Sequence, residues 1–555
     1  MKILPHTIVS QAEFDDIMGQ NEGMSIGEIT RPSEEGMRQL IDLWVDRIDN
    51  LINLIQEAKP DSVLIEKYFS ERGFTYEDYK LLFRDIEPSN YDRYRVFRVL
   101  EIKNKHFLID FTTHHEENFD DYLKAIGYFV KLRKATGLEF FFRRFHFRIS
   151  IAQMEYHTYA SGSTGSGKSQ LLRQLFYRMQ KMSAPKSSMT LILIDPHGDI
   201  SKEIKTSHLN YENKERFILI DPELKSGFLP VINPLQIEWE TEDDVVNHAQ
   251  HLCDAIVNVS GSDVSTNMVS LLLPSLTLLI KRKGSTLLDL IDLMQDTNDE
   301  LVELGLKMDY EPHRKVFVNY RKRWKQQKEA IVARLQPFLN FPACGRIIDG
   351  ESTINLKQEM DSGKVIIFNL SQRAFGRDGS IALGRFIVST IKSLALNRGK
   401  HRMPTFMYID ECQRFVSQSF LEILEEARKF GLHLVMANQS AERLGDAMDV
   451  TLSNTGVKLI GSNGSIKTLK MLAATTGTNY ETLSKLKDFN FFIKTRDKDG
   501  QTIKPFDILM TDKSYTMTEE QEKEIDEYIL EKYYVDTTKQ IEETDAFTKP
   551  KRFEL

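Results

Sequence analysis

The sequence predicts an α/β protein whose core is a parallel β-sheet, covered by helices on both faces and interrupted by an all-helical insertion. From about residue 151, short apolar runs alternate with segments of helical periodicity, which is typical of a parallel sheet. The runs are almost continuously apolar, and this indicates strands that are buried on both faces. We expect core strands at residues 190–194, 217–220, 365–368, 405–409 and 433–436.

Strand-like runs are missing between about residues 236 and 350, where helical periodicity dominates, so this stretch is predicted to be the insertion. The region before the core carries several helix-like periodic stretches and no motif with recognisable chemistry. We therefore expect a mostly helical N-terminal accessory domain at 1–150, a core in two parts at 151–235 and 351–515, the insertion at 236–350, and an acidic helix with a polar tail at 516–555.

The composition, 41% hydrophobic and 28% charged, is that of an ordinary soluble globular protein. The net charge of −8 is mild, so any contact with nucleic acid must come from a local basic patch. Three widely separated cysteines, Cys253, Cys344 and Cys412, show neither metal-ligand spacing nor a disulfide framework. No run reaches the roughly 18 apolar residues of a membrane span, and residues 269–280, which contain Pro274, are expected to form a buried helix. We expect a cytoplasmic protein with no integral membrane segment.

Residues 162–169 read GSTGSGKS and fit the phosphate-binding loop G-x-x-x-x-G-K-[ST] at every fixed position. The glycines let the backbone wrap closely, so that its N–H groups point at the β-phosphate. Lys168 should reach the β- and γ-phosphates, and the Ser169 hydroxyl should ligate Mg²⁺. A chance turn is the alternative, but the helix expected at 170–180 would also favour an anion at its N-terminus. The predicted nucleotide-binding positions are Gly162, Ser163, Thr164, Gly165, Ser166, Gly167, Lys168, Ser169 and Gln170.

A second element supports an ATP and Mg²⁺ site. Residues 403–411 read MPTFMYIDE, an apolar strand that ends in two acidic residues. Asp410 would hold Mg²⁺ through water, and Glu411 would polarise the water that attacks the γ-phosphate. The alternative is a strand that ends in acidic residues by chance. Because the sequence also contains the phosphate loop, we favour the interpretation as a Mg²⁺ and ATP site.

Two further positions follow the acidic pair at suggestive intervals. Gln439 ends the strand expected at 433–436, and the carboxyl ends of strands line the ligand crevice of such sheets. Gln439 could therefore sense the γ-phosphate or position water. Arg428 precedes this strand and could act in a neighbouring subunit as an arginine finger, or it could be a solvent-exposed helix residue.

With these elements in place, residues 145–510 resemble the FtsK/HerA superfamily of ring-forming DNA translocases. Within it, the chain is most similar to the conjugative coupling-protein ATPases of type IV secretion and to their soluble HerA-like relatives. The resemblance also rests on LIDPHGD at 193–199, Asp221-Pro222, INPL at 232–235, VIIFNLS at 365–371, YIDECQRF at 408–415, ARKFG at 427–431 and ANQ at 437–439.

The resemblance implies a RecA-like motor core, a homohexameric ring and nucleic acid in a central channel. It suggests Arg428 as the residue donated in trans and Gln439 as the sensor. His197 and Asp199 would lie near a strand end, where we expect a structural turn rather than a catalytic role. Coupling proteins usually carry N-terminal membrane helices, and none is expected in this sequence.

Two basic segments could touch nucleic acid. Residues 314–334 hold eight Lys or Arg and one acidic residue, with Tyr320 and Trp324 among them, so they could follow phosphates and stack on bases. The alternative is a solvated helix face with its aromatic residues in the core. A second basic run, RRFHFR at 143–148, alternates Phe with basic residues and is more simply explained as an amphipathic strand.

The predicted function is an ATP-driven DNA translocase that works as a homohexameric ring. One alternative is an ATPase that drives protein secretion or assembly. Another is an ATPase ring that scaffolds a nuclease or other effector in anti-phage defence, in which case residues 1–150 would dock the partner protein.

Overall fold

A computed structural model describes residues 24–31, 146–184, 186–259, 266–398, 402–495, 506–510 and 516–536. The chain divides into two compact units. The smaller unit comprises residues 1–150 and 493–511, and the larger comprises residues 151–492 and 512–555.

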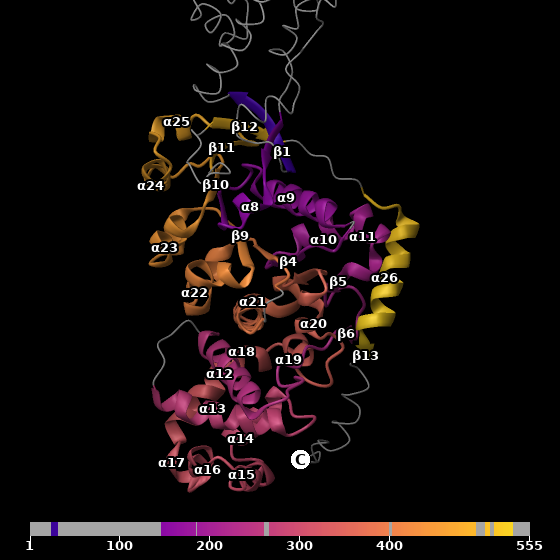
Figure 1. Cartoon of the computed structure of the whole chain (residues 1–555), viewed down its shortest axis with the longest axis vertical. Helices are drawn as coiled ribbons and strands as arrows, with labels where there is room; N and C mark the ends of the chain where they lie inside the picture. The colour runs from indigo at the N-terminus through magenta and orange to yellow at the C-terminus, as the bar shows by residue number, and fades with distance from the viewer. Residues whose placement is uncertain are drawn as a thin grey trace, which may run out of the picture. The chain divides into compact units, whose positions relative to one another are not determined.

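The core of the larger unit is a parallel sheet with the strand order β10-β3-β9-β8-β4-β7-β5 (Figure 1). All five predicted core strands are confirmed, and their side chains are buried along their whole length. The sequence interpretation missed β3 and β10, which are only four residues long and include the polar residues Thr158, Ser161 and Lys458. The strands are β3 (Thr158–Ser161), β4 (Thr190–Asp195), β5 (Phe217–Ile220), β7 (Val365–Asn369), β8 (Thr405–Ile409), β9 (Leu432–Asn438) and β10 (Val457–Ile460).

Helices cover both faces of this sheet, as its apolar strands require. Figure 1 shows α9 (Lys168–Ser183) on one side of β4 and β9, and α21 (Gln372–Leu396) with α22 (Gln418–Glu426) on the other. Among the described residues, α21 alone is long and apolar enough to cross a membrane, and 72% of its most apolar window is buried inside the fold. Near its start α21 is interrupted by a non-helical residue, Gly376 (φ 63°).

The insertion consists only of helices in its described residues, as expected, and Figure 1 shows them gathered at one end of the larger unit. Its helices α12 and α18 pack on α21. The predicted buried helix at 269–280 is confirmed as part of α13, with Pro274 inside it. The insertion helices are α12 (Glu242–Asn258), α13 (Thr266–Lys281), α14 (Leu287–Met294), α15 (Asp299–Gly305), α16 (Glu311–Phe317), α17 (Tyr320–Arg323), α18 (Lys325–Leu339) and α19 (Pro342–Ile348).

The expected acidic helix near the C-terminus is α26 (Glu519–Tyr533), which packs on α11 (His208–Glu212). After it, β13 (Val535–Asp536) pairs antiparallel with β6 (Phe228–Leu229). The Tyr534 hydroxyl, which is buried, donates to the carbonyl of Leu219 (2.9 Å) and accepts from the N–H of Asp221 (2.9 Å). The segment after α26 is thus tied to the edge strand β5. The polar tail lies outside the described residues.

Short helices complete the larger unit. They are α8 (Ile151–Met154), α10 (Asp199–Lys205), α20 (Leu356–Asp361), α23 (Ala447–Asn454), α24 (Ile466–Thr476), α25 (Tyr480–Ser484), and the 3₁₀ turns η3 (Lys214–Arg216), η4 (Cys412–Arg414), η5 (Ala427–Phe430) and η6 (Ala441–Leu444). The strand β11 (Asn490–Lys494) follows α25.

In the smaller unit, β1 (Met24–Arg31) pairs antiparallel with β2 (His146–Ile149) and with β12 (Phe506–Met510). The strand expected in the basic run at 143–148 is confirmed from residue 146 onward. The predicted helices of the N-terminal region lie outside the described residues.

Candidate nucleotide-binding site

The phosphate loop joins β3 to α9, so it opens at the carboxyl end of a central strand. Gly165 (φ 87°) and Gly167 (φ 89°) adopt the left-handed conformation that favours glycine. Gly167 also approaches the Phe489 ring so closely that an added Cβ would lie 2.6 Å from a ring carbon. The glycines are therefore required by the left-handed turns of the loop and, at Gly167, by the close contact with the Phe489 ring.

Backbone and hydroxyl contacts fix both flanks of the loop. The Gly162 N–H donates to the carbonyl of Asn438 (3.3 Å). On the other flank, the N–H and the hydroxyl of Ser163 both donate to the carbonyl of Ser462 (2.9 and 3.0 Å). Ser166 presents a buried hydroxyl with no hydrogen-bond partner among the described residues. A buried polar atom of this kind in a glycine-rich loop fits a site built for a polar ligand.

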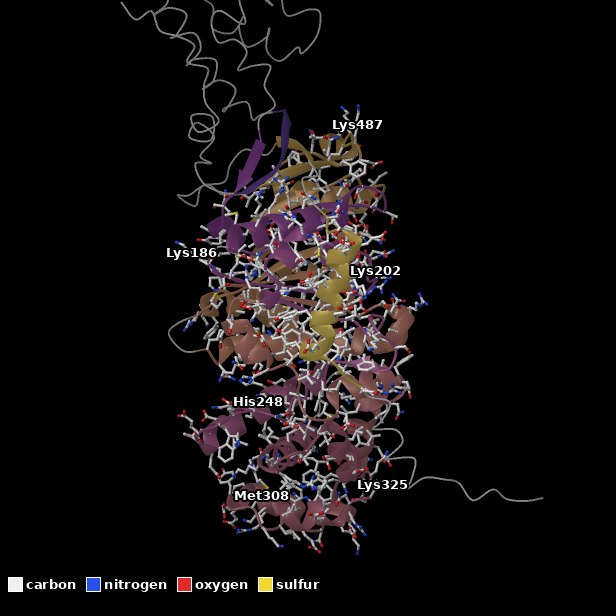
Figure 2. All side chains as sticks on the ribbon, turned by 90° about the vertical axis from the view of Figure 1, so that its right-hand side faces the viewer. Lys186, Lys202, His248, Met308, Lys325 and Lys487 are labelled. Atoms are coloured by element: carbon white, nitrogen blue, oxygen red, sulfur yellow. The ribbon has the colours of Figure 1, made fainter. Side chains whose placement is uncertain are left out.

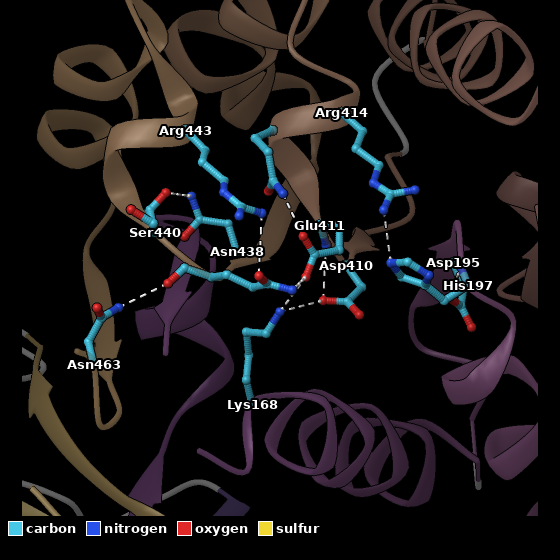
Figure 3. Close-up of polar contacts among 12 residues, drawn as sticks. Lys168, Asp195, His197, Asp410, Glu411, Arg414, Asn438, Ser440, Arg443 and Asn463 are labelled. Carbon is cyan, nitrogen blue, oxygen red and sulfur yellow. Dashed lines mark hydrogen bonds and ion pairs between the residues drawn. The ribbon is translucent and has the colours of Figure 1, made fainter. Parts of the chain in front are cut away.

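Lys168, the first residue of α9, joins the loop to the acidic pair (Figure 3). Its Nζ lies 2.8 Å from Oε1 of Glu411 and 3.4 Å from Oδ1 of Asp410. The three side chains are only 4–6% exposed, so the charges are removed from water and depend on one another for compensation. The structure thus brings together three of the predicted site residues.

Asp410 and Glu411 directly follow β8, at the edge where parallel strands end. Glu411 has a φ of 48°, which is uncommon for a residue with a side chain and is found mostly where function requires a particular geometry. Its N–H donates to Oδ1 of Asp410 (2.9 Å), which holds the Asp410 carboxylate against the backbone of Glu411.

The two acidic residues differ in their pKa. Burial raises the pKa of Asp410; the neighbouring charges of Glu411 and Asp195 add to this effect, and Lys168 opposes it. Burial alone would also raise the pKa of Glu411. The ion pair with Lys168 and the hydrogen bonds from Lys168, Gln413 and Gln439 outweigh burial and leave that pKa below its usual value. Glu411 is therefore the ionised carboxylate that a water-polarising base requires.

Gln439 lies at the site, as its position after a core strand suggested. Its Nε2 donates to Oε1 of Glu411 (3.0 Å), and its Oε1 accepts from Arg443 (3.3 Å). Its backbone carbonyl accepts from Asn463 (2.9 Å). Arg443 and Asn463, which are labelled in Figure 3, thus hold Gln439, and Gln439 itself contacts Glu411.

Sequence reasoning missed Gln413, whose Nε2 donates to Oε2 of Glu411 (2.5 Å). Glu411 therefore receives hydrogen bonds on both carboxylate oxygens, and Gln413 supplies the bond to the second. The Gln413 Oε1 is buried and has no partner among the described residues. Its position two residues after Glu411 was the signal in the sequence that could have identified it as a site residue. Arg443 and Asn463 carried no comparable signal, because they reach the site from separate loops.

Ser169 and Asp410 are oxygen donors of the kind that Mg²⁺ prefers. Ser169 is exposed on the first turn of α9, and Asp410 is buried at the end of β8. Lys168, which directly precedes Ser169 in the sequence, contacts Asp410 (3.4 Å). These residues fit the metal part of the prediction.

Arg428 does not lie at this site. It belongs to η5, before the first residue of β9, whereas Gln439 follows the last. The seven residues of β9 separate the two positions by about 23 Å. Arg428 is exposed, and its guanidinium carbon lies 3.7 Å from the centroid of the Tyr156 ring. Arg428 therefore makes no part of the cluster formed by Lys168, Asp410, Glu411 and Gln439 in its own chain.

The LIDPHGD segment forms a turn, with Gly198 in the left-handed conformation (φ 84°). The buried Asp195 accepts from the N–H groups of His197 (3.0 Å) and Ser201 (2.8 Å), which ties the turn to the start of α10. Nε2 of His197 also contacts Arg414 (3.1 Å) in the turn after Glu411. Asp199 is the first residue of α10. The geometry agrees with the expected structural turn.

In the basic segment of the insertion, Tyr320 and Trp324 are 1% and 7% exposed and belong to the core. They cannot stack on bases, so the alternative interpretation is correct for the aromatic residues. Lys328 is also buried and pairs with Asp296 (2.6 Å). The cations that remain exposed are Lys315, Arg321, Lys322, Arg323 and Lys325.

Two family models match this chain. Residues 144–376 match the model described as the central domain of helicase HerA. Residues 404–504 match the model described as the TraM recognition site of TraD and TraG. No curated protein matches the chain.

Several solved structures are similar to this chain. The plasmid coupling protein TrwB with a non-hydrolysable ATP analogue is 14% identical, with a TM-score of 0.50 over 66% of this chain and 88% of that chain. The unbound monoclinic form of the bacterial conjugative coupling protein TrwB has a TM-score of 0.48 at 14% identity, over 66% and 87%. VirB4 of Thermoanaerobacter pseudethanolicus has a TM-score of 0.44 at 16% identity, over 64% and 89%.

At these identities the structural likeness concerns the fold. The first family match contains the phosphate loop, and the second contains Asp410, Glu411 and Gln439. The site residues that the structure brings together thus come from both matched regions. Over these two ranges the chain is a HerA/FtsK-like P-loop ATPase that resembles the conjugative coupling proteins.

Proposed function

We propose that this chain is an ATP-hydrolysing motor that moves DNA as a homohexameric ring in the cytoplasm. The observation that carries the proposal is the convergence of Lys168, Asp410, Glu411 and Gln439 beside the phosphate loop. ATP would bind along residues 162–170, with Ser169 and Asp410 holding Mg²⁺. Bound there, Mg²⁺ would neutralise charge on the β- and γ-phosphates.

The ion pair between Lys168 and Glu411 indicates how hydrolysis would be controlled. In the structure, the ammonium of Lys168 contacts the carboxylate that should act as the base (2.8 Å). The phosphate oxygens of ATP would compete for this ammonium and draw it towards the β- and γ-phosphates. Glu411 would then be held by Gln413 and Gln439 alone, ionised and able to accept a proton from the attacking water.

Arg428 would complete the site of a neighbouring subunit. A closed ring is built from head-to-tail contacts, so each subunit presents a different edge to each neighbour. Arg428 lies at the amino edge of the sheet and the nucleotide residues lie at the carboxyl edge, as a finger supplied in trans requires. Its guanidinium would stabilise the charge of the γ-phosphoryl group during transfer.

The insertion supplies the proposed contact with DNA. Lys322, Arg323 and Lys325 are exposed on α17 and at the start of α18. In Figure 2, Lys325 lies on the insertion, at the opposite end of the view from Lys487 near the phosphate loop. The patch is therefore remote from the nucleotide and could touch phosphates through simple charge contacts. The proposed domains have separate roles. The motor core comprises residues 151–235 and 351–515, the insertion comprises 236–350, and the C-terminal segment comprises 516–555. Residues 1–150 would form a domain that docks a partner protein.

Hydrolysis measured with and without double-stranded and single-stranded DNA tests this function. We expect stimulation by DNA that falls as salt rises, because released counterions drive the contact. A Lys168→Ala variant should lose hydrolysis, whereas Lys202→Ala, at an exposed surface ion pair, should not. Retained DNA-stimulated hydrolysis in Lys168→Ala would show that the site is misassigned.

A motor that acts on protein is the second candidate. The match of residues 404–504 to a model named for recognition of the protein TraM favours it. Absence of DNA binding and of DNA stimulation at low salt would refute the DNA motor in favour of this candidate. Co-expression with neighbouring gene products, followed by mass measurement, would then show whether a protein partner such as a nuclease forms a stable complex.

A further inference from the structure

The phosphate loop has two flanks that differ in chemistry. Its strand, β3, pairs with β9 on one side and with β10 on the other. The β9 side carries Asp410, Glu411 and Gln439, which define where the γ-phosphate must lie. The β10 side is formed by the loop after that strand and by the residues before β11.

The flank on the β10 side is attached to the phosphate loop by hydrogen bonds. Ser462 accepts two bonds from Ser163, and its hydroxyl donates to Oδ1 of Asp488 (2.7 Å). The next residue, Phe489, donates its N–H to the carbonyl of Ser166 (3.0 Å). Phe489 is thus held against the loop by its backbone.

The side chain of Phe489 has no evident structural purpose. Its φ of 63° is unfavourable for a bulky residue, and a glycine would make the same backbone hydrogen bond without strain. Its ring packs against Gly167, yet 44% of the residue remains exposed. Phe489 thus combines a strained backbone with a large apolar ring that is partly exposed beside the phosphate loop. This combination points to a ligand that covers the ring.

We propose that the Phe489 ring is the platform on which the base of the bound nucleotide stacks. This inference rests on the proposed function only in taking a nucleoside triphosphate as the substrate. The γ-phosphate is directed to the β8–β9 side by Lys168 and the acidic pair, so a triphosphate laid along the loop sends its nucleoside towards the opposite flank. Phe489 lies on that flank, in contact with the loop itself.

Stacking makes a specific prediction about selectivity. Every base has an aromatic face, so a stacking platform binds purines with little regard to their hydrogen-bonding edges. We therefore expect adenine and guanine nucleotides to bind this chain with similar affinity through Phe489. We expect removal of the ring to weaken both about tenfold, which corresponds to about 1.4 kcal/mol.

Calorimetric titration of the full chain with ADP and with inorganic tripolyphosphate, both with Mg²⁺, tests the proposal. Phe489→Gly removes the ring together with the backbone strain, and tripolyphosphate binding reports whether the phosphate loop keeps its structure. It should bind ADP about tenfold more weakly and tripolyphosphate as tightly as the unmodified chain, and Phe489→Trp should restore ADP binding. The control is Tyr480→Ala, which removes another exposed aromatic ring, 37% exposed on α25.

The outcomes separate this proposal from the proposed function. Unchanged ADP binding in Phe489→Gly overturns the stacking platform and leaves the ATPase assignment intact. Equal weakening of ADP and tripolyphosphate also overturns it, because Phe489 would then only support the loop. If the unmodified chain binds neither ligand, the proposed function itself fails, and the platform fails with it.

Discussion

Replacing Lys168 by Met tests the physical account of the ion pairs that Lys168 forms with Asp410 and Glu411. Met keeps most of the aliphatic stem and removes the ammonium that lies 2.8 Å from Glu411 and 3.4 Å from Asp410. Two adjacent carboxylates would then be buried without a compensating cation. Removing one partner of a buried ion pair typically destabilises a fold by about 3–5 kcal/mol.

The protein can limit this loss by binding a proton. Neutralising one carboxyl group with an ordinary pKa near 4.3 at pH 7 costs about 3.7 kcal/mol, at about 1.36 kcal/mol per pH unit. We therefore expect Lys168→Met to lower the free energy of unfolding by roughly 3–4 kcal/mol at pH 7. In the variant, the folded state binds more protons than the unfolded state, so the loss should shrink to about 1 kcal/mol near pH 5.

Urea unfolding of the nucleotide-free chain at pH 7 and pH 5 measures this effect. Adding Glu411→Gln to Lys168→Met should recover most of the loss, because one buried charge is gone. The matched control is Lys202→Met, which breaks the ion pair with Glu223 in which Lys202 is 59% exposed, and it should cost less than about 1 kcal/mol. A loss in Lys168→Met that is absent at pH 7, or equal at both pH values, would refute the reasoning.

Three further predictions follow from the same contacts. Gln413→Ala removes a hydrogen bond that lowers the pKa of the Glu411 carboxyl group, so the acid limb of the pH profile of kcat should move to higher pH. The control is Gln418→Ala, on the exposed surface of α22, which should leave the acid limb unchanged. Arg428→Ala should reduce hydrolysis by on the order of 10³-fold while ATP binding, measured by calorimetry, stays unchanged; weakened binding to a lone subunit would contradict a role in trans. Burial lowers the pKa of His157 to about 3 and of His433 to about 4, from 6.5, so the stability present above pH 6.5 should decline as pH falls towards 4, and a flat urea midpoint over this interval would contradict their burial as neutral groups.

Local patterns in the sequence were sufficient for the parts of the fold whose signals lie within one segment. Continuous apolar runs identified the buried strands, because a strand covered on both faces cannot carry polar side chains. The glycine spacing identified the phosphate loop, since its left-handed positions at Gly165 and Gly167 are steric requirements. The acidic pair was recognisable because it ends an apolar strand. Helical periodicity also separated the insertion from the sheet.

The sequence could not predict which residues of the basic segment and of the short strands are buried. The basic segment of the insertion alternates charged and aromatic residues, and both a stacking surface and a core-facing stripe are compatible with that order. Packing against neighbouring helices decided that Tyr320 and Trp324 are core residues. The short strands β3 and β10 were missed for a related reason. They are four residues long, and their polar residues are buried by neighbours that are distant in the sequence.

By itself, then, the sequence determined which segments carry the nucleotide chemistry, because each motif is a local steric or electrostatic requirement. Only the tertiary structure decided how the segments meet. Contacts made across about 320 residues place Phe489 against the phosphate loop, and no local pattern encodes such a contact. Arg428 precedes β9 and Gln439 follows it, so the length of this strand places the two residues at opposite edges of the sheet. The orientation of the strands therefore places Gln439 beside Glu411 and keeps Arg428 away from this site.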